Sequence, residues 1–194
     1  MKIVKKILLT GASGFVGKSV QSKLQKHVVT LTSRTEEIEN SSRFFRKTIS
    51  STENFSDCLS GVEVVIHTAA RVHQMNDLAE NPQKEFMETN CFGTLNLARQ
   101  AAKAGVKRFI FISSIKVNGE QSHKSRPFSF DDPRRPEDPY AASKAKAEEG
   151  LLKIADDTRL EITIIRPPLV YGPDVKANFA ALLKLASKNL PLPL

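Results

Sequence analysis

The chain has 194 residues, 40% of them hydrophobic, which suits one domain, or one domain with part of a second, and excludes a disordered chain. Its formal net charge is +8, but the lysines are scattered at helix-surface spacing and no basic run carries interleaved aromatic residues, so we expect an anionic small ligand such as a nucleotide and no nucleic acid. No apolar run approaches the roughly 20 residues that span a bilayer, so we expect no membrane insertion.

Apolar runs alternate with amphipathic stretches along the whole chain. The runs predict strands at 6–10, 28–33, 43–49 (weakly), 62–70, 107–114 and 161–167. The amphipathic stretches predict helices at 15–26, 82–104, 140–156 and 178–188, and the polar, proline-rich stretch 118–138 predicts a loop. Strands that alternate with helices and are apolar on both faces predict a parallel sheet covered on both sides, an α/β fold.

Two features indicate a cytoplasmic protein. The first 14 residues are basic and then apolar, as in a signal peptide, but the apolar part is too short and glycines stand where a cleavage region would be. We therefore interpret this segment as a first strand. The chain has two cysteines, Cys58 and Cys91, and we expect both to be buried free thiols in a reducing compartment.

A glycine-rich loop follows the first predicted strand. Gly11, Gly14 and Gly17 are spaced three apart, as in a turn whose backbone approaches a pyrophosphate at a helix N-terminus and whose third glycine allows close packing of the helix on the strand. A tight turn between a strand and a helix needs some glycine in any case, so the alternative is a purely structural turn. Its position directly after the first strand favours dinucleotide binding. The other residues of the loop expected to contact the cofactor are Ser13, Phe15 and Val16.

The end of the second predicted strand bears on the choice between NAD and NADP. A carboxylate there would bind the ribose 2′-hydroxyl of NAD, but this chain has Ser33 and Arg34 and no carboxylate before Glu36. A hydroxyl and a guanidinium suit a 2′-phosphate, so we expect NADP to be favoured over NAD. The alternative is that Arg34 is a solvated loop residue.

Tyr140 and Lys144 lie one turn apart at the start of a predicted helix. Residues four apart share a helix face, so the lysine ammonium could lie near the phenol and favour the phenolate. Such a tyrosine could act as a general acid/base. Alone, the pair suggests a core-packing tyrosine and a surface lysine. Ser114, however, ends a predicted strand, at the edge where α/β sheets bind ligands, and supports a reactive site.

Several segments in order along the chain resemble one family: LLTGASGFVG, VVIHTAA, NCFGTLNLARQAAKAGVKRFIFISS, PYAASKAKAE and IIRPPLVYGP. They resemble the extended short-chain dehydrogenase/reductases, in the NAD-dependent epimerase/dehydratase group that acts on nucleotide sugars. The resemblance implies a Rossmann-type doubly wound parallel sheet in residues 1–172, which would carry the catalytic residues. It implies that residues 173–194 begin a substrate-binding lobe that is largely absent from this chain. It further implies a homodimer and no metal.

The resemblance also implies roles for individual residues. Tyr140 would be the catalytic acid/base. Lys144 would hold the cofactor ribose and lower the tyrosine pKa, and Ser114 would bind the reacting oxygen of the substrate. Asn178 would lie at the diphosphate of the sugar nucleotide. The remaining cofactor contacts that the resemblance implies are His67, Ala69, Ala70, Asn90, Pro167 and Leu169.

The chain departs from the family pattern at two places. The aspartate that usually follows the third strand and contacts adenine is replaced by Ile49 and Ser50. Family members that dehydrate sugars carry Asp-Glu directly after the active hydroxyl residue, whereas this chain has Ile115 and Lys116. Neither can supply the carboxylate base of the elimination, so dehydration is disfavoured.

Redox chemistry at a sugar carbon remains. The resemblance is closest to UDP-4-keto-6-deoxyhexosamine 4-reductases, which would use an exchangeable NADPH. The alternative is a UDP-glucose or UDP-N-acetylglucosamine 4-epimerase, which would retain NAD. Further alternatives are a dinucleotide-binding sensor and another small carbonyl reductase, such as a steroid or flavonoid reductase.

Overall fold

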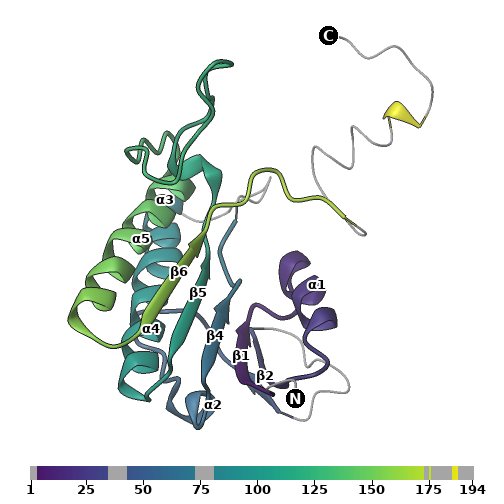
Figure 1. Ribbon diagram of the computed structural model, residues 1–194, viewed down its shortest axis with the longest axis vertical. Helices are drawn as coiled ribbons and strands as arrows, with labels where there is room; N and C mark the ends of the chain where they lie inside the picture. Colours follow the sequence, from purple (N-terminus) through teal and green to yellow (C-terminus); the bar gives the residue numbers. More distant parts are fainter. Residues whose placement is uncertain (1–3, 35–42, 73–80, 173–174, 176–184, 188–194) are drawn as a thin grey trace.

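Six parallel strands form one sheet in the order β3-β2-β1-β4-β5-β6 (Figure 1). The computed structural model describes residues 4–34, 43–72, 81–172, 175 and 185–187. The strands are β1 (Lys6–Thr10), β2 (Val28–Ser33), β3 (Phe44–Arg46), β4 (Val64–His67), β5 (Arg108–Ile112) and β6 (Glu161–Ile165). The order reverses between β1 and β4, as in the doubly wound dinucleotide-binding fold, so the predicted fold class is confirmed.

Helices cover both faces of the sheet (Figure 1). α1 (Phe15–Lys23) lies on one face, and α4 (Thr94–Lys103) and α5 (Pro139–Asp157) lie on the other. The shorter elements are α2 (Ser56–Leu59), α3 (Pro82–Phe86), the π-helical η1 (Met87–Gly93) and the 3₁₀-helical η2 (Ile115–Val117). In the described part of the chain, no helix is long and apolar enough to cross a membrane.

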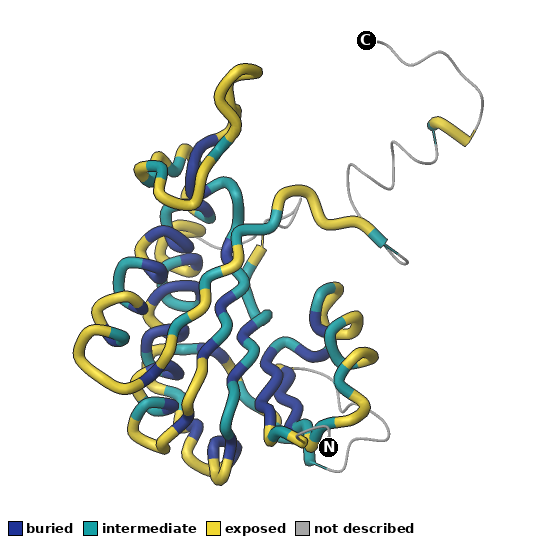
Figure 2. Tube along the Cα trace, in the orientation of Figure 1, coloured by how far each residue is buried: buried dark blue, intermediate teal, exposed yellow. Residues whose placement is uncertain are grey.

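The core has two parts, one on each face of the sheet. On β1, Leu8 belongs to the larger cluster with Phe109 and Leu151, and its neighbour Leu9 belongs to the smaller cluster with Leu31. Successive side chains of a strand point to opposite faces, so burial of both faces removes the polar alternation from the sequence. Figure 2 shows the largely buried central strands between the helix layers, with the exposed loop after β5 and the exposed stretch directly after β6 at one end of the sheet.

Several element boundaries differ from the prediction. The predicted helix at 82–104 is one continuous helical run, but α3, η1 and α4 divide it and its middle is π-helical. The weak third strand shrinks to three residues, and α2 was not predicted. Cys58 and Cys91 are free and buried, as expected. Most of the helix predicted at 178–188 lies outside the described residues.

The glycine loop brings α1 very close to β1. Gly11 has φ +68°, a conformation that L side chains rarely adopt. A Cβ added to Gly17 would lie 2.0 Å from the carbonyl oxygen of Gly11. The third glycine therefore allows the helix to pack directly on the loop, as the sequence predicts.

Gly17→Ala should destabilise the protein by at least about 2 kcal/mol, because the new methyl group meets backbone that cannot rotate away. Denaturant unfolding measures the change. Gly172→Ala is the control, because its Cβ would lie 3.8 Å from the Phe15 ring, an ordinary contact. Equal stabilities of the two variants would contradict this account of the loop.

Candidate active site

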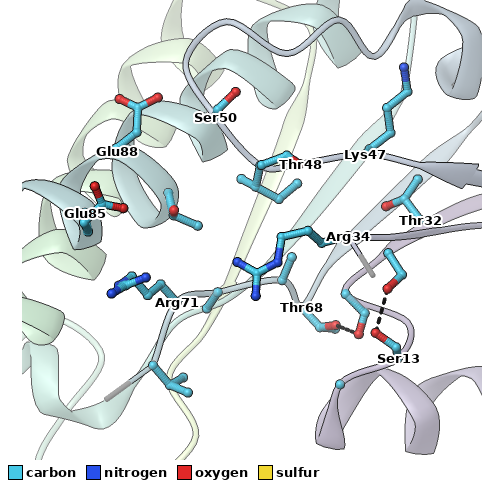
Figure 3. A pocket seen from close by; sticks show the side chains of 18 residues that line it. Ser13, Thr32, Arg34, Lys47, Thr48, Ser50, Thr68, Arg71, Glu85 and Glu88 are labelled. Carbon is cyan, nitrogen blue, oxygen red and sulfur yellow. Dashed lines mark hydrogen bonds between the residues drawn. The ribbon is translucent and has the colours of Figure 1, made fainter. Parts of the chain in front are cut away.

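A pocket of about 460 Å³ lies at the carboxyl ends of the central strands (Figure 3). Its walls come from the glycine loop, the ends of β2, β3 and β4, and the start of the α3–η1 helix. The lining residues are Gly11, Ser13, Gly14, Thr32, Ser33, Arg34, Lys47, Thr48, Ile49, Ser50, Thr68, Ala69, Ala70, Arg71, Val72, Glu85, Glu88 and Thr89. The strand order reverses here, which is where such sheets bind ligands.

The glycine loop ends at the N-terminus of α1. Gly14 is the N-cap of α1, and its N–H donates to the carbonyl of Gly11 at 2.9 Å. The first turn of α1 carries no acidic residue. Because Gly11, Ser13 and Gly14 line the pocket, the positive end of the α1 dipole is available to an anion there.

Arg34 and Lys47 both line the pocket, but they differ in whether a carboxylate neutralises their charge. Arg34 is exposed and reaches from the end of β2 into the pocket, as Figure 3 shows. Lys47 also lines it, but its ammonium lies 2.9 Å from Asp57 and 3.6 Å from Glu53, which neutralise its charge. Ser33 is buried and its Oγ lies 2.7 Å from Ser13 Oγ. Arg34 is thus the cation at the end of β2 that can meet a phosphate.

Tyr140 lies in the first turn of α5, and the local sequence explains why the helix starts there. Asp138 is the N-cap and its Oδ1 accepts a hydrogen bond from Ala141 N at 2.6 Å, and Pro139 occupies the first turn. Tyr140 is partly buried, and its ring meets Phe86 edge-on at 6.1 Å between centroids. Burial raises the pKa of the phenol, the Asp138 carboxylate adds to the rise, and the Lys116 ammonium opposes it.

Lys144 packs against β5. Its side chain is buried, and Nζ lies 4.2 Å from the centre of the Phe111 ring. Burial lowers the pKa of Lys144 to about 7, and the Glu148 carboxylate opposes this shift. Among the described residues no hydrogen bond joins Lys144 to Tyr140. Lys144 is not among the charges that act on the phenol here, where burial has the largest effect, and its predicted effect on the tyrosine pKa stays a prediction.

Ser114 follows β5 and caps η2, where its Oγ accepts from Lys116 N at 3.3 Å. The preceding Ser113 donates to the buried Glu148 at 2.6 Å. Glu148 also accepts from Arg134 at 2.9 Å and from Arg166 at 2.6 Å. These bonds tie the Ser114 turn to α5, to the 118–138 loop and to the end of β6.

Two residues expected at the cofactor, His67 and Asn90, are buried in this structure, and their contact with a cofactor stays a prediction. His67 is fully buried, and its ring nitrogens hydrogen-bond Thr10 Oγ1 at 2.6 Å and Thr94 Oγ1 at 2.9 Å. Burial and the nearby Lys144 lower the pKa of His67 to about 3, so it stays neutral. Asn90 is also buried and holds the backbone of Arg71 through bonds of 2.8 and 3.0 Å. Both side chains are buried, and neither lines the pocket.

The family follows from a comparison with protein-family models. Residues 7–191 match the model described as the NAD dependent epimerase/dehydratase family. The chain belongs to the NAD-dependent epimerase/dehydratase family. It is 46% identical over 196 residues to a protein named UDP-glucose 4-epimerase from Vibrio cholerae, covering 99% of this chain and 60% of that protein. It is 35% identical over 112 residues to human dTDP-D-glucose 4,6-dehydratase, covering 58% of this chain and 31% of that protein.

Solved structures agree with this membership. MoeE5 in complex with UDP-glucose and NAD superposes with a TM-score of 0.80 at 30% identity, over 93% of this chain and 60% of that chain. UDP-glucuronic acid 4-epimerase from Bacillus cereus in complex with NAD gives a TM-score of 0.80 at 26% identity, over 96% and 65%. The chain thus spans about three fifths of the length of these epimerase/dehydratase family members.

Not every residue predicted for this epimerase/dehydratase site lines the pocket. The predicted residues that do are Gly11, Ser13, Gly14, Ser33, Arg34, Ala69 and Ala70. Those outside its lining are Phe15, Val16, Gly17, His67, Asn90, Ser114, Tyr140, Lys144, Pro167 and Leu169. Asn178 lies outside the described residues. Sequence reasoning missed Arg71, Glu85 and Glu88 on the wall opposite β2. Arg71 could have been predicted as a pocket residue, because it stands shortly after the end of a strand. The helical pattern gives no indication that Glu85 and Glu88 line a pocket.

Proposed function

We propose that this chain forms the catalytic core of a nucleotide-sugar enzyme that oxidises and reduces C4 of a UDP-hexose, with 4-epimerisation as the overall reaction. The observation that carries the proposal is the placement of Ser114 after β5 and Tyr140 at the start of α5, beside the pocket formed at the same edge of the sheet. The 46% identity to a UDP-glucose 4-epimerase supports the choice of reaction.

The pocket residues fit a nicotinamide dinucleotide. The glycine loop and the N-terminus of α1 would hold the pyrophosphate, and Ser33 and Arg34 would meet the adenosine ribose. When bound, the nicotinamide supplies the hydride chemistry at C4. Tyr140 would take the proton of the C4 hydroxyl during oxidation and return it during reduction, and Ser114 Oγ would hydrogen-bond the same oxygen.

The residues after Ser114 argue against dehydration as the overall reaction. The position of the dehydratase glutamate holds Lys116, whose Nζ bonds Glu120 and Asp138 at 2.8 Å each. An ammonium held between two carboxylates cannot act as the base that takes the C5 proton.

A second candidate is an NADPH-dependent UDP-4-keto-6-deoxyhexosamine 4-reductase. Arg34 in the pocket favours it, because a cofactor that exchanges every turnover and carries a 2′-phosphate would use that cation. The homodimer, the cytoplasmic location and the division into a domain at 1–172 and a lobe from 173 remain predictions.

One experiment separates the candidates. The complete protein is given UDP-glucose or UDP-N-acetylglucosamine alone, and then a UDP-4-keto sugar with NADPH. Formation of the 4-epimer without net change of cofactor supports the epimerase. Stoichiometric NADPH consumption with the keto sugar supports the reductase. Release of a 4-keto-6-deoxy product from UDP-N-acetylglucosamine would refute both.

Arg34→Asp should weaken NADP(H) relative to NAD(H) by about 10- to 100-fold, because it replaces attraction to a 2′-phosphate with repulsion. Titration of both cofactors measures the ratio. Arg159→Asp is the control, because it makes the same charge change beside the amino end of β6, away from the pocket. An unchanged ratio in Arg34→Asp would mean that Arg34 is a solvated side chain.

A further inference from the structure

Lys116 joins the two elements that carry Ser114 and Tyr140. Its backbone N–H donates to Ser114 Oγ at 3.3 Å. Its ammonium donates to Asp138 Oδ2 at 2.8 Å and to Glu120 Oε1 at 2.8 Å. One residue therefore contacts the serine hydroxyl through its backbone and the first turn of α5 through its side chain.

Asp138 uses its two carboxylate oxygens for different purposes. Oδ1 accepts from Ala141 N at 2.6 Å and caps α5, while Oδ2 accepts from Lys116. Tyr140 stands two residues after this cap. The ion pair is partly shielded, with side-chain exposures of 42% for Lys116 and 20% for Asp138. The pair thus links the first turn of α5 to η2.

Among the residues that the structure describes, the charged groups that act on the phenol are Asp138 and Lys116. The α3 helix presents the uncharged Phe86 ring to Tyr140. Lys144, one turn further along α5, lies over Phe111 on β5. Glu85 and Glu88 line the pocket and are not among the charges that affect the phenol. The charge contribution to the pKa of the Tyr140 phenol therefore comes from one carboxylate and the ammonium paired with it.

We propose that Lys116 is a positioning residue: it holds the first turn of α5 against the Ser114 turn and balances the Asp138 charge beside the Tyr140 phenol. The expected effect of Lys116 on turnover rests on the proposed function, in which Tyr140 is the acid/base. Its electrostatic part is independent of that function, because it concerns the phenol in the protein without substrate.

The chain suits a direct test, because it has two tyrosines and no tryptophan. Tyr171 is 71% exposed, and Tyr171→Phe leaves Tyr140 as the single phenol of these 194 residues, whose ionisation ultraviolet absorbance follows. In that background Lys116→Met should raise the titration midpoint of Tyr140 by roughly 0.5 to 1 pH unit, because the carboxylate loses its counter-charge. Asp138→Asn should lower it, because asparagine caps a helix about as well as aspartate but carries no charge.

Opposite shifts distinguish this role from a merely structural one, which would move both midpoints together or neither. Lys146→Met is the matched control, because Lys146 pairs with Glu149 on the exposed side of α5. Lys116→Arg should restore the midpoint. If Lys116→Met does not fold, Asp138→Asn carries the test alone. Midpoints unchanged in both variants, or shifted in the same direction, would overturn the proposal.

In the complete enzyme, the rise of the oxidation rate with pH should move to higher pH in Lys116→Met, with about a 10-fold lower kcat near neutrality. The KM for the cofactor should not change, because Lys116 does not line the pocket. If the phenol titrations shift as expected but the pH profile does not, the role of Tyr140 as acid/base fails and the placement of Lys116 stands.

Discussion

Tyr140→Phe should lower turnover of the complete enzyme by about 10²–10⁴-fold, the usual loss when a general acid/base is removed. The substitution removes one oxygen from a ring that packs edge-on against Phe86, so the fold and the start of α5 should survive. Single-turnover measurement of the reduced nicotinamide, with saturating substrate, isolates the chemical step.

Tyr171→Phe offers a matched control, because it removes the same oxygen from an exposed ring. Dinucleotide affinity should be similar in both variants and in the unmodified protein. Tyr140→Phe that turns over within a few-fold of the unmodified protein would show that another group moves the proton.

Glu148→Gln should destabilise the protein by about 2–4 kcal/mol, because it removes the charge that compensates two arginines. Glu148 is fully buried, and Arg166, with 14% of its side chain exposed, bonds it at 2.6 Å. Arg134 and Ser113 bond the same carboxylate. Thermal and denaturant unfolding measure the loss. Glu149→Gln is the control one residue away, where an exposed pair with Lys146 should contribute less than about 0.5 kcal/mol.

The stabilisation by Glu148 should also depend on pH with a definite sign. Burial tends to raise the pKa of Glu148, but hydrogen bonds from Arg166, Ser113 and Arg134 outweigh burial and lower it below the ordinary 4.5. A lowered pKa means that the contribution is complete above the unfolded value and is lost as pH falls through the folded value. The stability difference from Glu148→Gln should therefore be constant near neutrality and shrink in acid. A difference that grows in acid would contradict the assignment.

Sequence patterns within a few neighbouring residues were enough to predict many of the strands and helices. The strand at 28–33 coincides with β2, because four of its six residues are valine or threonine, which favour strands. The start of α5 follows from Asp138 and Pro139, which cap and open a helix in any context. Gly17 was identified as the close-packing glycine from its position in the loop. The short helix α2 was not predicted, and β3 was predicted only weakly and too long, because three or four residues are held by their neighbours and not by their own propensity.

The sequence by itself determined the fold class, the glycine loop and the residues that follow each strand, because these depend on patterns within a few neighbouring positions. Only the tertiary structure decided which side chains meet. Helical spacing placed Lys144 on the same face as Tyr140, but the packing of α5 on β5 placed its ammonium over Phe111. Lys116 and Asp138 stand 22 residues apart, and Glu148 lies 35 residues from Ser113. Such pairs form because parallel strands bring their carboxyl ends to one edge of the sheet, and no local pattern encodes which of the side chains gathered there will pair.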